Sequence, residues 1–244
     1  MPERENTILY ATDVHGDLDF YRKLLETAAK KKVKAVVIGG DILPTSLLVF
    51  DASEQRLYLE YEMLPLFAGF RKKHKGIDIY IMMGNDDFIV NMDVLKAAEK
   101  KGVLKVMHNR VHKVGSLHMI GYSCVNPGPY PIKDWVKSEA EIRKDLQRLK
   151  GKLNGDDVIL VTHVPPHKTR LDFYYGMRHV GSRSIREFIE KVQPRMSLHG
   201  HIHESFELTG TFTQKIGKTV AVNPGNARMV LINLDDPNSI KCLP

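Results

Sequence analysis

The stretch TILYATDVHGD, residues 7–17, joins an apolar run to polar residues that are able to bind a cation. Its first five residues are apolar or β-branched, which is typical of a strand buried on both faces. Asp13 and His15 follow two positions apart, so both side chains point to the same side of an extended segment. The stretch therefore predicts a buried strand that ends in a pair of ligand candidates.

Four more apolar runs of the same kind follow along the chain. Helical patterns, with apolar residues on one stripe, separate most of these runs. This alternation of strands and helices is typical of an α/β fold. The further runs are KAVVI (34–38), DIYIM (78–82), VILVT (158–162) and RMSL (195–198), and the helical patterns cover 17–32, 53–73, 94–101, 137–150 and 182–192.

Three residues mark the ends or breaks of the helical patterns. Asp17 and Ser53 are expected to cap helices, because short polar side chains accept hydrogen bonds from the first turn. Pro65 is expected to kink or break the helix of 53–73. The apolar stretch LYLEYEMLPLF (57–67) fits either a cover over a sheet or a contact between subunits.

Two other segments predict antiparallel strands. Residues 103–124 alternate between apolar and polar positions, and residues 217–235 form an expected terminal strand pair around NPGN (223–226). The expected fold is therefore α/β, with two packed mixed β-sheets flanked by helices. A chain of 244 residues is long enough to bury a full core, and we expect residues 1–244 to form a single domain.

Composition narrows the class of protein. Hydrophobic residues make up 43% and charged residues 27%, which is ordinary for a soluble globular protein. No apolar run approaches the length that crosses a bilayer, and the first residues lack a signal-peptide pattern. We therefore expect a cytoplasmic protein with no membrane contact. Cys124 and Cys242 lack metal or redox spacing and are expected to be reduced structural thiols.

The positive charge of the chain suits an anionic substrate. A net charge of +7 raises the local concentration of phosphate-like ligands. The basic runs KKKVK (30–34) and RKKHK (71–75) lie at the ends of helical patterns, where lysine commonly faces solvent. Neither run is interleaved with the aromatic residues that a nucleic-acid platform requires.

Each of the five apolar runs leads into a loop that carries a carboxylate, an amide or an imidazole. Because an open α/β sheet presents the carboxyl ends of its strands along one edge, such loops converge in space. The five motifs are therefore expected to form one site. In chain order they are TDVHGD (12–17), GGD (39–41), MGND (83–86), THVPP (162–166) and HGHIH (199–203).

The donor groups in these motifs favour a pair of metals. Carboxylate, amide and imidazole ligands without thiolate suit Mn²⁺ or Fe²⁺, and Zn²⁺ also fits. Seven such groups exceed what one metal needs, and with an open position for water they fit two metals ~3.5–4 Å apart, as used in phosphate-ester hydrolysis.

Over residues 13–203, the chain resembles the calcineurin-like metallophosphoesterases. The resemblance rests on five motifs in the same order: D-x-H, G-D, G-N-x-D, a lone histidine at a strand end and G-H-x-H. NPGN resembles a segment that these proteins often have near their C-terminus. THVPP, followed by HVGSRSI (179–185) and GHIHES (200–205), is similar to a branch of small phosphodiesterase-like members, including class III cyclic-nucleotide phosphodiesterases. The resemblance implies a four-layer αββα sandwich.

The resemblance also implies which seven residues are the ligands and divides them between two metals. In the family, such a centre lowers the pKa of a bridging water to near neutrality, and the resulting hydroxide attacks the phosphorus. One metal would bind Asp13, His15 and His203, the other would bind Asn85, His163 and His201, and Asp41 would bridge the two.

The chain departs from the family at Asp86. In many members this position is a histidine that contacts phosphate and protonates the leaving oxygen. Aspartate has an ordinary pKa of ~4, so beside two cations it is expected to be ionised and unable to donate a proton. Asp87 matches the final acidic position of the motif and is expected to hold a ligand or a loop by hydrogen bonds.

The segment 167–182 follows the ligand candidate His163 and combines basic, aromatic and glycine residues. It fits a rim over the site, in which Arg170, Arg178 or His179 meets the non-scissile part of the substrate. It also fits a solvated loop with a small aromatic cluster. We favour the rim, which adds His179 to Asp86 and Asp87 as candidates for a role in catalysis.

The remaining histidines carry less information. His199 alternates with His201, so it fits either a hydrogen-bond donor to a ligand or a packed residue at a strand end. Surface or sheet-face positions are expected for His74, His108, His112 and His118.

Three functions remain compatible with the sequence. The leading hypothesis is a phosphodiesterase with two divalent metals that acts on a small molecule, such as a cyclic nucleotide. A nuclease of the same fold would need an extended basic channel, and the chain offers no basic-aromatic tract to build one. A non-catalytic scaffold would be expected to have degraded ligand positions, whereas all seven are filled here. The sequence leaves the oligomeric state open.

Overall fold

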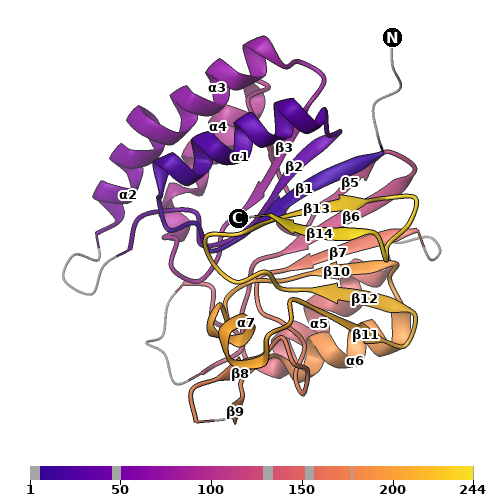
Figure 1. Ribbon diagram of the computed structural model, residues 1–244. Helices are drawn as coiled ribbons and strands as arrows, with labels where there is room; N and C mark the ends of the chain where they lie inside the picture. The colour runs from indigo at the N-terminus through magenta and orange to yellow at the C-terminus, as the bar shows by residue number, and fades with distance from the viewer. Residues whose placement is uncertain (1–5, 46–50, 129–133, 152–156, 177, 244) are drawn as a thin grey trace.

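The computed structural model describes residues 6–45, 51–128, 134–151, 157–176 and 178–243. Within these residues, two mixed β-sheets of six strands each stack in the middle of the molecule (Figure 1). The first sheet contains β1 (Thr7–Ala11), β2 (Ala35–Gly39), β3 (Asp78–Met82), β4 (Lys105–Val106), β13 (Met229–Asn233) and β14 (Ile240–Leu243). The second contains β5 (Val111–Val114), β6 (Leu117–Tyr122), β7 (Val158–Thr162), β10 (Met196–Leu198), β11 (Thr213–Ile216) and β12 (Thr219–Val222).

The order of strands is β14-β13-β1-β2-β3-β4 in the first sheet and β11-β12-β10-β7-β6-β5 in the second. The strands β1, β2 and β3 run parallel to one another, as do β6, β7, β10 and β12. The expected runs 7–11, 78–82 and 158–162 are strands with the predicted bounds, and the other two begin one residue late.

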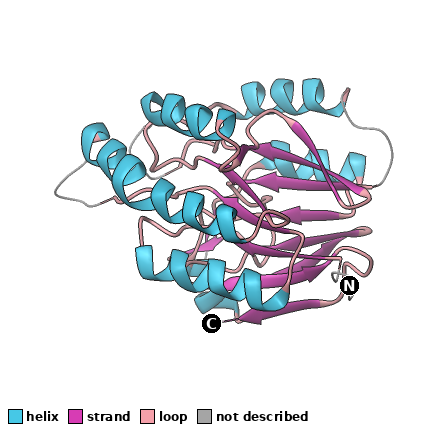
Figure 2. Cartoon of the chain, turned by 90° about the horizontal axis from the view of Figure 1, so that it is seen from above, coloured by secondary structure: helices cyan, strands magenta, loops and turns pink. Residues whose placement is uncertain are grey.

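Helices cover the outer face of each sheet, which confirms the expected four-layer sandwich. In Figure 1, α1 to α4 lie beside the first sheet and α5 and α6 beside the second, and Figure 2 shows strands running alongside one another with helices along them. The helices are α1 (Leu18–Lys31), α2 (Ala52–Tyr58), the π-helix η1 (Leu59–Met63), α3 (Leu64–Lys73), the short η2 (Ile89–Asn91), α4 (Met92–Lys100), α5 (Glu139–Lys150), α6 (Arg183–Val192) and α7 (Glu204–Thr209).

Alternate residues of each central strand serve two separate cores. In β1, Ile8 and Tyr10 pack between the two sheets, whereas Leu9 and Ala11 face the helices. In β7, Ile159 likewise lies in the core between the sheets. This double burial explains why the strands are continuous apolar runs rather than alternating ones.

The helix boundaries partly match the expected signals. Asp17 caps α1 as expected, because its Oδ1 accepts a hydrogen bond from the Phe20 N–H at 2.9 Å. The expected cap at Ser53 is wrong: Asp51 caps α2, and its side chain accepts from the Ser53 N–H at 2.8 Å. Pro65 does not end the helix but follows the wide π-turn of η1, which accommodates a residue without an N–H.

The stretch 57–67 covers the first sheet with one face only. Leu59, Met63 and Phe67 are buried in the core, whereas Leu57 and Tyr61 are exposed.

The expected strand pair around NPGN is wrong. Although β12 and β13 both form, β12 pairs with β10 and β11 in the second sheet, whereas β13 pairs with β1 and β14 in the first. The connection therefore crosses between sheets, and a turn-like sequence does not distinguish such a crossing from a hairpin. Of the strands in 103–124, β5 and β6 are antiparallel as expected, but β4 joins β3 in parallel.

None of the helices in the described part of the chain has both the length and the apolar character needed to cross a membrane.

Candidate metal centre

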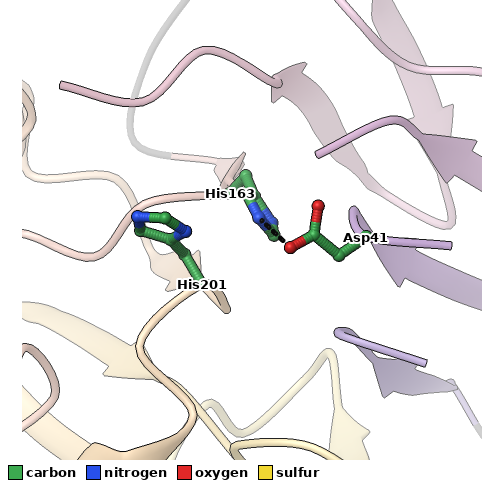
Figure 3. Close-up of side chains that lie close together, drawn as sticks. All are labelled: Asp41, His163 and His201. Carbon is green, nitrogen blue, oxygen red and sulfur yellow. Dashed lines mark ion pairs between the residues drawn. The ribbon is translucent and has the colours of Figure 1, made fainter. Parts of the chain in front are cut away.

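The loops after five parallel strands meet at one place, where the two sheets present their carboxyl ends. Two overlapping groups of side chains have ligand atoms within 4.8 Å of one another. Asp41 belongs to both groups, and Figure 3 shows it facing His163, with His201 nearby. The first group is Asp13, His15 and Asp41, and the second is Asp41, His163 and His201.

The other two ligand candidates adjoin these groups. The side-chain oxygen Oδ1 of Asn85 lies 3.0 Å from Nε2 of His163. The ring of His203 lies 6.2 Å from the ring of His15, measured between centroids. The structure thus brings all seven residues together, with Asn85 beside the second group and His203 beside the first. Their binding of metal stays a prediction.

The charges at the centre fit a bound cation. Nε2 of His163 lies 3.2 Å from Oδ2 of Asp41. Burial lowers the pKa of His163, but the Asp41 carboxylate outweighs this effect and raises the pKa to about 10. Burial raises the pKa of Asp41, yet His163 holds it well below its ordinary value. The pair is thus held in its charged form, and a metal bound by both residues would replace the proton of His163, since histidine binds metals through its neutral ring.

The backbone at the centre is held in an unfavourable conformation. Among the described residues, nine non-glycine residues have positive φ, and four of them are ligand candidates. Such strain clusters at functional sites, where the surrounding structure enforces it. Here the enforcing contacts include hydrogen bonds from the Asp13 N–H to the Gly40 carbonyl and from the His15 N–H to the Asp41 carbonyl. The four residues are Asp13 (φ 52°), His15 (φ 48°), Asp41 (φ 49°) and His201 (φ 64°).

Gly84 lets two ligand loops approach each other closely. A Cβ atom at this position would lie 2.6 Å from Nε2 of His163 and would also collide with Asp41. Any other residue at position 84 would therefore push apart the two side chains that share the second group.

Asp87 joins the loop after β2 to the loop after β3. Its buried carboxylate accepts hydrogen bonds from the backbone N–H groups of Gly84 at 2.7 Å, Ile42 at 3.0 Å and Leu43 at 2.9 Å. Burial and the charge of Asp41 raise the pKa of Asp87 to about 7. Asp87 thus holds the loops after β2 and β3 by hydrogen bonds, as expected of the final acidic position of its motif.

Asp86 lies at the edge of the centre and orients a ligand candidate. Its Oδ1 accepts a hydrogen bond from Nδ2 of Asn85 at 2.6 Å, which turns the amide oxygen of Asn85 toward His163. Its other oxygen lies 4.0 Å from Nδ1 of His15. Asp86 therefore places a further carboxylate beside the first group.

Gln55 is a site residue that the sequence analysis missed. It is buried in α2 and reaches the loop after β3: it donates to the Asp86 carbonyl at 2.7 Å and accepts from the Phe88 N–H at 2.9 Å. Gln55 lies on the same helical stripe as the buried Leu59 and Met63. A polar residue at an apolar position of the stripe is the sequence feature that could have identified it.

Asn223, the first residue of NPGN, supports the last ligand loop. Its buried Nδ2 lies within hydrogen-bond distance of the carbonyl groups of Gly200, at 3.3 Å, and Ile202, at 3.1 Å. The NPGN segment thus fixes the loop that carries His201 and His203.

His199 packs at the end of its strand and is not directed at the seven ligand candidates. Its ring nitrogens lie 2.8 Å from Oγ1 of Thr162 and 2.9 Å from Oγ of Ser197. Burial lowers its pKa to about 3, so the ring is neutral. These contacts favour the interpretation as a strand-end residue.

The segment 167–182 contains a short hairpin of β8 (Phe173–Tyr174) and β9 (Arg178–His179). Nδ1 of His179 lies 2.7 Å from Oδ1 of Asp172, outside both ligand groups. The Arg170 guanidinium donates to the Thr209 carbonyl in α7, so it anchors the segment.

Four histidines lie away from the centre, as expected. The half-buried His108 ring stacks on Tyr122, and burial lowers its pKa to about 4. His118 is exposed on β6, and the half-buried rings of His74 and His112 pack against Phe70 and Tyr80.

Comparisons with known proteins match the chain by sequence and by fold. Residues 7–205 match the sequence profile of the calcineurin-like phosphoesterase family. No curated protein matches the chain by sequence. The fold is similar to that of TT1561 from Thermus thermophilus, with 14% identity, a TM-score of 0.67 and 98% of each chain covered.

Two further solved structures have the same fold. GAP50, the anchor in the inner membrane complex of Plasmodium, is 11% identical, with a TM-score of 0.58 and coverage of 99% of this chain and 88% of that one. A putative 5'-nucleotidase from Staphylococcus aureus is 14% identical with a TM-score of 0.56, and the match covers 98% of this chain but 54% of the nucleotidase.

Proposed function

Because the chain belongs to the calcineurin-like phosphoesterase family, we propose that it is a metal-dependent phosphodiesterase that acts on a small molecule. The observation that carries the proposal is the pair of ligand groups that share Asp41. Two adjacent groups with one common carboxylate suit two divalent metals, and the donor types suit Mn²⁺ or Fe²⁺. When bound, such metals stabilise the charge that develops on phosphoryl oxygens and activate water.

Asp86 supports a preference for diesters over monoesters. Its carboxylate lies 4.0 Å from the His15 ring, at the edge of the first ligand group. A negative charge there repels a dianionic monoester more strongly than a monoanionic diester. An ionised carboxyl group also has no proton to give to the leaving oxygen, so diesters with stable leaving groups such as p-nitrophenolate are the better substrates. Cyclic nucleotides, which lose a sugar alkoxide, stay among the compounds to screen.

The placement of the basic runs speaks against the alternative of a nuclease. The runs 30–34 and 71–75 lie just before β2 and β3, at the amino ends of these strands. The ligand candidates follow the carboxyl ends of the same strands. The two clusters of lysine are therefore at the opposite edge of the sheet and cannot line a channel into the centre.

The alternative of a non-catalytic scaffold is favoured less. The same fold serves as an anchor in GAP50, so the fold does not require catalysis. In this chain, however, all seven ligand candidates are present, and Asp87 and Gln55 hold two of the loops that carry them by hydrogen bonds. A scaffold has no need for such support.

Metal content and turnover of bis-p-nitrophenyl phosphate, measured on the same preparation, test the proposal. We expect about two divalent ions per chain and turnover with Mn²⁺ that chelation abolishes. Comparison of cyclic nucleotides with plasmid and single-stranded DNA then separates a small-molecule enzyme from a nuclease. A chain that holds no metal and hydrolyses none of these substrates would be a scaffold.

A further inference from the structure

A cleft of about 450 Å³ lies at the carboxyl edge of the second sheet, between the ends of β6 and β7 and the start of α6. It is separate from the seven ligand candidates. The residues that line it include Asn126, Ser138, Glu139, His167, His179 and Arg183.

The walls of the cleft are formed by segments that adjoin the metal centre along the chain or by contact. His167 comes four residues after the ligand candidate His163. Ser138, another lining residue, comes three residues after Trp135, whose indole N–H donates to the carbonyl of Asp87 at 2.8 Å. The cleft is therefore a candidate for the other part of a substrate whose phosphate lies at the centre.

Asp172 fixes the ring of His179 in the cleft wall. The fully buried Asp172 carboxylate accepts hydrogen bonds from the backbone N–H groups of Thr169 at 2.8 Å, and of Lys168 and Gly181 at 3.1 Å each. Its Oδ1 lies 2.7 Å from Nδ1 of His179, which must be the donor because the oxygen is an acceptor. The ring is thus held in one orientation, with Nε2 left for other contacts.

The lining of the cleft includes donors for an anion. Arg183 is exposed and carries a permanent positive charge. The Glu139 carboxylate is engaged with the start of α6, where it accepts from the Ser182 hydroxyl at 2.9 Å and from the N–H groups of Arg183 and Ser184 at 2.8 Å each. Glu139 keeps its negative charge, but its oxygens are occupied by these three donors, whereas the Arg183 guanidinium and the oriented His179 imidazole belong to lining residues and are able to donate to an anion.

We propose that this cleft binds a second anionic group, a phosphate or a carboxylate, on the non-scissile part of the substrate, with His179 and Arg183 as its partners. The assignment rests on the proposed phosphodiesterase function and specifies its substrate: a diester that carries a further negative charge beyond the scissile phosphate.

Two diesters that differ in one group provide the test. The probes are p-nitrophenyl phenyl phosphate and the same diester with a carboxylate on its phenyl ring, both hydrolysed with Mn²⁺. Loss of a hydrogen bond to a charged group typically costs about tenfold or more in affinity. The unmodified enzyme should therefore have a KM roughly tenfold lower for the carboxylated diester. Arg183→Ala and His179→Gln should each raise that KM more than the KM for the plain diester.

Lys191→Ala is the matched control, because it removes one positive charge from an exposed position of the same helix, outside the cleft. It should keep the preference for the carboxylated diester. Equal KM values for both diesters in the unmodified enzyme, or a preference that survives in Arg183→Ala and His179→Gln, would overturn the assignment and leave the proposed function standing. Absence of turnover with both diesters would instead contradict the proposed function. If His179→Gln fails to fold, Arg183→Ala alone decides.

Discussion

The left-handed backbone at His15 should make the glycine variant more stable to unfolding than the alanine variant, which is the reverse of the usual order. At an ordinary position, alanine is more stable than glycine by ~0.4–1 kcal/mol, because glycine gives the unfolded chain more freedom. His15 has φ 48°, and in this region a Cβ atom costs ~1–2 kcal/mol that glycine does not incur. His15→Gly should therefore unfold with a free energy up to ~1.5 kcal/mol higher than that of His15→Ala.

His203 is the matched control. It is also a histidine of the centre, but its φ of −71° and ψ of −22° lie in the right-handed helical region. There His203→Ala should be more stable than His203→Gly by ~0.4–1 kcal/mol. All four variants lose one imidazole, so this loss cancels when the alanine–glycine difference in the free energy of unfolding at position 203 is subtracted from that at position 15. What remains is the cost of the left-handed conformation, ~1–2 kcal/mol.

Urea denaturation of the four variants, with a chelator present, measures these differences without a contribution from bound metal. The midpoints can be compared directly if the slopes of the transitions agree. If alanine is more stable than glycine by the same margin at both positions, the backbone at His15 stores no strain and the reasoning is refuted.

Four further substitutions test other parts of the site. Asp41→Asn removes the carboxylate common to both ligand groups, so bound metal should fall from about two ions per chain and activity should fall with it; two tightly held ions with full turnover would contradict the ligand assignment. Asp86→His should raise kcat/KM on diesters with poor leaving groups by at most ~10²–10⁴-fold, because an imidazolium can donate a proton to the leaving oxygen. If kcat/KM of the unmodified enzyme depends only weakly on leaving-group pKa, another residue already donates this proton. Gln55→Leu should reduce activity at limiting Mn²⁺ by ~10–100-fold, and excess metal should restore part of it; equal activity at every Mn²⁺ concentration would show that the loop holds its shape alone. For Glu139, burial raises the pKa, but hydrogen bonds from the start of α6 outweigh this effect and lower it below the ordinary value of 4.5. Its contribution to stability is therefore present above pH 4.5 and is lost as the pH falls through the lower pKa of the folded state. Glu139→Gln should cost about 1 kcal/mol or less at pH 7, because the side chain is half-exposed, and should flatten the loss of stability on acidification; an unchanged pH dependence would exclude this role.

The central strands and the positions of the ligand candidates were predictable because each depends on local pattern. Strands such as β1 and β7 are buried on both faces, so they appear as continuous apolar runs with sharp ends. Loops that leave the carboxyl ends of such strands converge for geometric reasons, which places Asp13 near His201 despite their separation in the chain. Its carboxylate accepts the His201 N–H at 2.9 Å.

What depends on distant contacts was not predictable from pattern. Whether β12 and β13 pair with each other or join different sheets is decided by β10 and β1, which lie far away in the sequence. Gln55 belongs to no motif, and its role follows only from the position of α2 over the loop after β3. The left-handed conformations of Asp41 and His15 likewise arise from hydrogen bonds between separate loops.

The ligand candidates are divided between the two sheets: Asp41 follows a strand of the first, whereas His163 and His201 follow strands of the second. An ion held by this group is attached to both layers, so the layers cannot separate while it stays bound. Metal affinity and the resistance of the sandwich to opening are therefore coupled, and an ion at about 1,000 times its Kd adds about 4.1 kcal/mol to the free energy of unfolding. A metal bound at this centre would in this sense also be a cross-link, and the supply of metal would set part of the equilibrium stability of the sandwich.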